Sequence, residues 1–244
     1  MTVLEEQLNR LEEEIAAACR AAGRARSDVE LMAVSKTFPA ETLAEAASLG
    51  LTLFGENRVQ EYAAKAERAA ELWRGKVQEQ PRIHLIGHLQ SNKAAKAAEL
   101  FDGIDSLDSV KLGERLNEAA GKLNKKLPVL LEVKLSPEET KAGVDPESAE
   151  AAELLERLPD FSWIEMRGLM TIAPWGVAEE ETRACFRRLR ALRERWAALH
   201  PKLDLSVLSM GMSGDFPLAI AEGATRIRVG TALFGRRTRR AESE

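Results

Sequence analysis

A lysine at the end of an apolar run is the first residue whose position suggests chemistry. Lys36 closes the run at positions 30–36, which reads ELMAVSK. If this run is a strand, Met32, Val34 and Lys36 share one face, because side chains alternate along a strand. A lysine beside apolar surface loses hydration, so its pKa falls and its neutral amine can attack an aldehyde. Most lysines are solvated surface residues, so Lys36 alone does not decide between these two roles.

Two segments of small residues near the end of the chain suggest a phosphate site. They read SMGMSGD at 209–215 and RVGT at 228–231. Small residues let backbone N–H groups approach an anion, and Asp215 could cap a helix that follows. In a (β/α)₈ barrel, the loops after strands seven and eight form the usual phosphate site. An amine at one side of the barrel and a phosphate cradle at the other suit a phosphorylated aldehyde.

Other polar residues lie near the ends of the same apolar runs. Arg226 and Arg228 share a face, and Arg228 is nearer the carboxyl end, where it can reach a bound ring. We expect Arg226 to form a structural ion pair instead. Asn57 either hydrogen-bonds a ligand or caps the next helix. His84 and His88 share a face, but the sequence suggests no third ligand nearby, so we predict no metal site.

The elements that must position these residues alternate between apolar runs and helical stretches. The helical stretches cover 40–49, 110–123, 149–158 and 180–199, and the eight apolar runs cover 30–36, 51–57, 82–88, 103–109, 128–134, 164–171, 204–211 and 226–235. Such alternation indicates a parallel sheet, and eight repeats in about 250 residues indicate a (β/α)₈ TIM barrel of the α/β class. The alternative is an open doubly wound sheet. The missing GxGxxG after the first run disfavours its dinucleotide-binding version.

An extra helix precedes the first run, within residues 1–24. Its apolar stripe consists of Leu4, Leu8, Leu11, Ile15 and Cys19, and Gly23 is a plausible stop. We expect this helix to pack against the barrel, with a dimerisation helix as the alternative. We predict a single domain over 1–244, ending in a frayed tail at 236–244.

Composition excludes several classes of protein. A net charge of -4, from 35 basic and 39 acidic residues, disfavours a dedicated nucleic-acid binder. No apolar run approaches the length of a membrane span, and the acidic, periodic N-terminus does not read as a secretory signal. We therefore expect a cytoplasmic protein. Cys19 and Cys185 are far apart and outside any CxxC motif, which favours reduced thiols over a disulfide or a zinc site.

Motifs spread over nearly the whole chain resemble the pyridoxal 5′-phosphate (PLP) homeostasis protein family. That family comprises single-domain barrels related to the N-terminal domain of alanine racemase. The matching stretches are AVSKTFP (33–39), FGENRVQE (54–61), IHLIGHLQSNK (83–93), ETKAG (139–143), RGLMTI (167–172), LSMGMSGDFPLAI (208–220) and RIRVGTALFGRR (226–237). Each stretch alone is a weak signal, but the ordered set is highly specific.

The resemblance implies a role for each residue that matches the family's motifs. It implies a PLP Schiff base on Lys36 and an arginine, Arg228, against the pyridine nitrogen. It implies phosphate contacts from Ser213, Gly230 and Thr231. Asn57 and Met210 would lie close to the cofactor. We expect a monomer, with apo forms of PLP-dependent enzymes as its further partners.

The expected chemistry is binding and delivery of PLP, without efficient catalysis. An arginine does not readily release a proton, so the pyridine nitrogen beside it stays largely unprotonated and the ring is a poorer electron sink. Racemases of related fold also take a tyrosine from a second domain, which we do not expect here, and this chain's one tyrosine is Tyr62. The alternatives are a PLP-dependent racemase of low activity and a cofactor-free Schiff-base aldolase.

Overall fold

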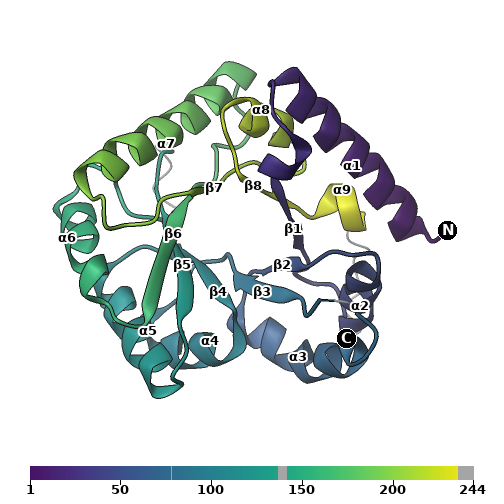
Figure 1. Cartoon of the computed structure of the whole chain (residues 1–244), viewed down its shortest axis with the longest axis horizontal. Helices are drawn as coiled ribbons and strands as arrows, with labels where there is room; N and C mark the ends of the chain where they lie inside the picture. The colour runs from purple at the N-terminus through teal and green to yellow at the C-terminus, as the bar shows by residue number, and fades with distance from the viewer. Residues whose placement is uncertain (78, 137–141, 236–244) are drawn as a thin grey trace, which may run out of the picture.

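The eight predicted strand regions form a closed barrel in the computed structural model, which describes residues 1–77, 79–136 and 142–235. Neighbouring strands are parallel and follow one another in chain order (Figure 1). Pairing of β1 with β8 closes the ring. The strands are β1 Glu30–Val34, β2 Leu53–Glu56, β3 Arg82–Leu85, β4 Gly103–Leu107, β5 Leu127–Glu132, β6 Ile164–Met170, β7 Val207–Ser209 and β8 Arg226–Val229. The barrel prediction is therefore confirmed, and the open sheet is wrong.

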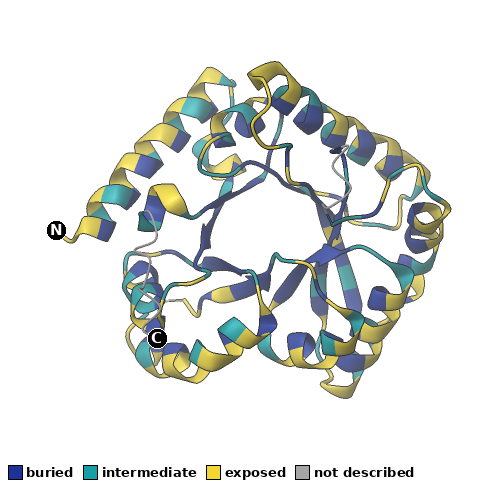
Figure 2. Ribbon diagram, turned by 180° about the vertical axis from the view of Figure 1, so that it is seen from behind, coloured by how far each residue is buried: buried dark blue, intermediate teal, exposed yellow. Residues whose placement is uncertain are grey.

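Helices cover the outside of the barrel and bury their apolar faces against the strands. Figure 2 shows buried strands surrounded by helices whose outward faces are exposed. Two of the helices begin at serine caps, because the hydroxyls of Ser109 and Ser148 accept backbone N–H bonds from the first turn. The helices are α1 Val3–Ala21, α2 Ala40–Ser48, α3 Val59–Trp73, α4 Ala94–Leu100, α5 Val110–Lys122, α6 Ala149–Arg157, α7 Glu179–Leu199, α8 Phe216–Ala221 and α9 Thr231–Phe234.

The first helix, α1, lies along the barrel wall beside α8 and α9 (Figure 1). Thr2 and Glu5 form a capping box at its start, and Gly23 follows its end with φ +66°. All five residues of the predicted apolar stripe are buried. The stripe is thus covered by this chain itself. No helix among the described residues has both the length and the apolar character needed to cross a membrane.

All eight strands end earlier than the predicted apolar runs, and the ends of β1 and β8 matter for the site. β1 ends at Val34 and Lys36 lies in a turn, so the prediction that Lys36 shares a strand face with Met32 and Val34 does not apply. β8 ends at Val229, and the predicted strand over 226–235 is wrong in its second half because residues 231–234 form α9. The hydroxyl of Ser213 accepts the N–H groups of Gly230 and Ala232, which satisfies free donors at the start of this helix.

Candidate functional site

The turn that carries Lys36 lies at the carboxyl ends of the barrel strands, directly after β1. Lys36 is half-buried there. The next residue, Thr37, has φ +71°, a left-handed conformation that residues other than glycine rarely adopt. The backbone N–H of Thr37 donates to the carboxylate of Glu61 on α3. A contact from α3 therefore holds this turn in a conformation that is unfavourable by itself.

A buried ion pair behind the turn adds a second set of restraints. Lys65 Nζ lies 2.8 Å from Glu56 Oε1 and donates to the carbonyl oxygens of Ser35 (3.1 Å) and Phe38 (2.8 Å). Glu56 is fully buried and also accepts the hydroxyl of Ser35 at 2.5 Å. Burial raises the pKa of Glu56, because the Lys65 ammonium offsets only part of the lost hydration. Sequence reasoning missed both members of this pair, although Glu56 belongs to the FGEN motif.

The loops after β7 and β8 meet at Ser213. Its Oγ accepts from the backbone nitrogens of Gly230 and Ala232, each at 3.3 Å. Two N–H groups that converge on one oxygen form a small anion-binding concavity, which a phosphate oxygen could also occupy. Thr231 is exposed at the first position of α9 beside these groups. The structure thus brings Ser213, Gly230 and Thr231 together, as the sequence predicted.

The loop that carries Ser213 packs tightly on α8. Gly211 has φ +92°, and a Cβ atom at this position would lie 2.5 Å from the Cβ atom of Ala219. Only glycine fits both the conformation and the space. Asp215 occupies the position before α8, but its carboxylate accepts the N–H of Met212 within the loop rather than capping the helix. The loop is therefore held by its own hydrogen bonds as well as by packing.

Arg228 is buried inside the barrel, with 4% of its surface exposed. Its guanidinium donates to the carbonyl oxygen (2.7 Å) and the hydroxyl (2.9 Å) of Ser209 and to the carbonyl oxygen of Thr171 (2.8 Å). Burial lowers the pKa of Arg228, although carboxylates including Asp105 and Glu132 oppose this shift. An arginine has five N–H donors, so these three bonds leave capacity for a ligand.

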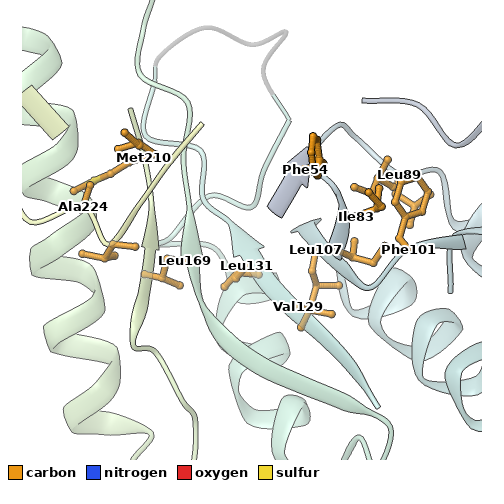
Figure 3. Packing of buried hydrophobic residues seen from close by; sticks show 14 of the residues in the cluster. Phe54, Ile83, Leu89, Phe101, Leu107, Val129, Leu131, Leu169, Met210 and Ala224 are labelled. Atoms are coloured by element: carbon orange, nitrogen blue, oxygen red, sulfur yellow. The ribbon is translucent and has the colours of Figure 1, made fainter. Parts of the chain in front are cut away.

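Met210 and Asn57, which were both predicted to lie close to the cofactor, differ in their surroundings. Met210 is fully buried in the apolar core and lies near Ala224 in Figure 3. Asn57 lies against Gly87, where a Cβ atom would be 2.9 Å from its Cγ. The cap position of α3 belongs to Arg58, so the alternative in which Asn57 caps this helix is wrong. Asn57 therefore stays a candidate for ligand contact.

A cavity of about 220 Å³ opens beside Asn57, and we call it the Glu132 cavity. Glu132 ends β5 with 4% of its surface exposed, and its Oε2 has no hydrogen-bond partner among the described residues. Burial raises its pKa to about 7, the nearby charge of Asp108 adds to this shift, and Arg228 offsets part of it. The cavity is lined by Asn57, Ile86, Gly87, His88, Glu132, Val133, Lys134, Leu135, Ser136, Ala142 and Ile172.

The two histidines do not form a pair. His84 is buried and its Nδ1 lies 2.8 Å from Asp105, whereas His88 is exposed beyond the end of β3, with its Nδ1 3.1 Å from Asp108. No group of three metal-ligating residues occurs in the described part of the chain. Arg226 also binds Asp105, at 3.1 Å. Burial alone would raise the pKa of Asp105, but His84 and Arg226 together hold it below its usual value.

Arg226 forms the structural ion pairs that the sequence predicted. Besides Asp105 it binds Glu30, with 2.8 Å between Arg226 Nε and Glu30 Oε2, and Arg82 binds the other oxygen of Glu30 at 2.8 Å. Arg226 begins β8 and Glu30 begins β1, so this network lies at the amino ends of the strands. It is therefore at the opposite end of the barrel from Lys36.

Tyr62, the one tyrosine of the chain, lies on α3 in the helical layer. It is 5% exposed, and its ring packs against Phe101 at a centroid distance of 5.2 Å. Burial raises the pKa of its phenol above its ordinary value. Its position in the helical layer does not suit it to acid–base chemistry at the barrel mouth.

Comparison with known proteins agrees with this geometry. The family model described as the N-terminal domain of alanine racemase matches residues 7–238. A pyridoxal phosphate homeostasis protein of Vibrio alginolyticus is 43% identical over 217 residues, which cover 88% of this chain and 89% of that protein. One from Aquifex aeolicus is 41% identical over 95% of this chain and 97% of that protein. The chain belongs to the pyridoxal phosphate homeostasis protein family.

Solved structures extend the comparison. PipY of Synechococcus elongatus PCC7942, determined with PLP bound, is 44% identical to this family member, with a TM-score of 0.82 and coverage of 95% of this chain and all of PipY. An alanine racemase of Clostridium difficile shares 15% identity with a TM-score of 0.67, and the match covers 94% of this chain and 57% of the racemase. This second likeness shows the barrel fold alone.

Proposed function

We propose that this chain holds PLP as a Schiff base on Lys36 and serves intracellular PLP homeostasis without efficient catalysis of its own. The observation that carries the proposal is the placement of a restrained lysine turn and an N–H concavity at one barrel mouth. Relatives about 40% identical to this chain are named pyridoxal phosphate homeostasis proteins, and PipY was solved with PLP bound.

The residues at the mouth fit the parts of PLP. PLP supplies an aldehyde and an electron-withdrawing ring, and it carries a phosphate. Lys36 provides the amine for the aldehyde. Ser213, Gly230 and Thr231 provide the hydroxyl and N–H donors that a phosphate prefers. Arg228 would lie toward the ring nitrogen and, as a donor that does not readily release a proton, would leave that nitrogen unprotonated.

Weak catalysis follows from the same residues. A ring left unprotonated beside Arg228 would be a poorer electron sink, so proton removal from a bound amino acid would gain less assistance. Tyr62, the one candidate phenol, is buried in the helical layer. Racemisation or transamination at ordinary enzyme rates, about 1–10³ s⁻¹, would contradict this part of the proposal.

The protein is proposed to act as a cytoplasmic monomer that releases PLP to apo enzymes. Burial of the α1 stripe supports the monomer, because the apolar surface that a dimerisation helix would need is covered by α8 and α9 of the same chain. The measurement is the mass in solution by light scattering, and a stable dimer would refute this part.

Borohydride trapping tests the proposal. Purified protein should absorb visible light, and reduction should fix a pyridoxyl group on the peptide that contains Lys36, as read by mass spectrometry. Lys36→Ala should lose both signals. Lys134→Ala is the matched control, because Lys134 also lies at the mouth and should keep them. A label on Lys134, or visible absorbance that survives Lys36→Ala, would refute the assignment.

A further inference from the structure

The Glu132 cavity contains an acid with one oxygen that no described residue satisfies, and we propose that the cavity binds a small primary amine in its ammonium form. The inference goes beyond the proposed holding of PLP. It depends on the residues of the cavity and not on Lys36, and it assigns a second ligand to the barrel mouth.

The Glu132 carboxyl is only partly satisfied by the protein. Its side chain is almost completely buried at the end of β5, yet Oε2 has no hydrogen-bond partner in the described part of the chain. A buried acceptor without a donor is unfavourable, and a buried charge is more so. Arg228 acts on Glu132 electrostatically, but its hydrogen bonds go to Ser209 and Thr171. A donor that enters the cavity would therefore complete what the protein leaves open.

The charges around the cavity favour a cationic ligand. Asp108 is a second carboxylate near Glu132, and its Oδ2 lies 3.1 Å from Nδ1 of His88, which lines the cavity. A cation relieves the repulsion between the two acids, whereas a neutral donor does not. A metal ion is the poorer choice, because the described residues contain no group of three metal ligands.

The volume and lining of the cavity limit the size and shape of the ligand. A cavity of about 220 Å³ is below the 300–1,000 Å³ that is typical of drug-sized ligands, so it suits a small molecule. Ile86, Leu135 and Ile172 give part of its lining an apolar character. An ammonium group against Glu132 with a short carbon chain against these residues matches both parts of the lining.

The charged groups around Glu132 predict how binding depends on pH. They are His88 after β3, Asp108 after β4, Lys134 after β5 and Arg228 on β8. Arg228 is held by its own hydrogen bonds, and Lys134 also has an interaction of its own. Because the pKa of Glu132 is about 7, a rise from pH 6 to pH 8 ionises it while a primary amine stays charged. Ammonium binding should therefore tighten about tenfold over this interval.

The experiment uses the full chain without PLP, a form in which the relative PipY was also solved. Uniformly ¹⁵N-labelled protein is titrated with propylammonium chloride at pH 6 and at pH 8, and NMR shifts of backbone amides are followed. We expect saturable shifts concentrated at the lining residues, tighter binding at pH 8, and binding at least about tenfold weaker for the neutral analogue 1-propanol.

Two variants test whether binding requires the carboxylate of Glu132. Glu132→Gln should weaken propylammonium binding at least about tenfold and remove its pH dependence. Glu222→Gln is the matched control, because Glu222 is also buried but lies at the end of α8 and should leave binding unchanged. Absence of saturable shifts, equal binding of 1-propanol, or unchanged binding by Glu132→Gln would each overturn the proposal. None of these results affects the borohydride label on Lys36, so the two proposals fail separately.

Discussion

Replacing Glu132 by glutamine should stabilise the protein, and more so as the pH rises. The two side chains have nearly the same shape, but the amide cannot ionise. In the native chain the carboxyl is buried at the end of β5, and its Oε2 has no partner among the described residues. The neighbouring carboxylate Asp108 makes ionisation still less favourable. The folded state therefore retains the proton on Glu132 to an unusually high pH.

The magnitude follows from the difference between the folded and unfolded states. The carboxyl of Glu132 has a pKa of about 7 in the folded protein, against 4.5 as its ordinary value, a difference of 2.5. Below pH 4.5 both states are protonated and stability is unaffected. Between the two values only the unfolded chain ionises, so stability falls by about 1.4 kcal/mol per pH unit. The loss reaches about 3 kcal/mol near pH 7 and then stays constant. Glutamine avoids this loss.

Urea denaturation followed by circular dichroism measures the effect at pH 4.5 and at pH 8. Glu132→Gln should match the native protein at the lower pH and exceed its free energy of unfolding by about 3 kcal/mol at the higher. Glu67→Gln, on the exposed surface of α3, should stay within about 0.5 kcal/mol at both. A difference that does not change with pH, or a variant less stable at pH 8, would refute the reasoning about a buried acid without a partner.

Three further changes test other parts of the structure. Lys65→Met leaves Glu56 buried without its ammonium partner and removes a restraint on the Lys36 turn, so it should slow the capture of PLP by Lys36. The rate is measured as the rise of visible absorbance after mixing. An unchanged rate would argue against restraint of the turn by α3. Arg226→Met should lower the free energy of unfolding by about 3–5 kcal/mol in urea, because one partner of a buried ion pair is lost, and should leave PLP binding intact. Alanine at both Ser213 and Thr231 should weaken the binding of PLP by about tenfold to a hundredfold in an equilibrium titration. The binding of pyridoxal, which lacks the phosphate, should change little. Equal weakening of both ligands would exclude this phosphate position.

The fold could be predicted from the sequence because its signals are local and repeated. Each barrel strand is a short apolar run, and each helix after it buries one stripe, so the pattern of eight repeats is visible without tertiary information. The α1 stripe was predicted residue by residue for the same reason. Arg226 was also predicted, since an arginine at the start of a buried strand needs an acidic partner.

The parts of the site that depend on contacts between elements could not be predicted. The Lys36 turn is restrained by Glu61 and Lys65, which lie one helical turn apart on α3, and nothing in the sequence indicates that this face meets the turn. The alternation of side chains also ends at Val34, where β1 ends, so it could not orient Lys36. α9 was missed because its first N–H groups are satisfied by Ser213 from another loop.

Buried acids at the two ends of the barrel differ in their partners and in the direction of their pKa shifts. At the amino ends of the strands, Asp105 is bound by both His84 and Arg226, and its pKa is held low. At the carboxyl ends, Glu132 keeps an oxygen without a partner, and its pKa is raised. A fully paired acid strengthens the fold, whereas an unpaired one weakens it unless a ligand supplies the missing donor. Among the described residues, the buried carboxylate oxygens without a partner belong to Glu56 and Glu132, which end β2 and β5, so both lie at the end of the barrel with the proposed PLP site.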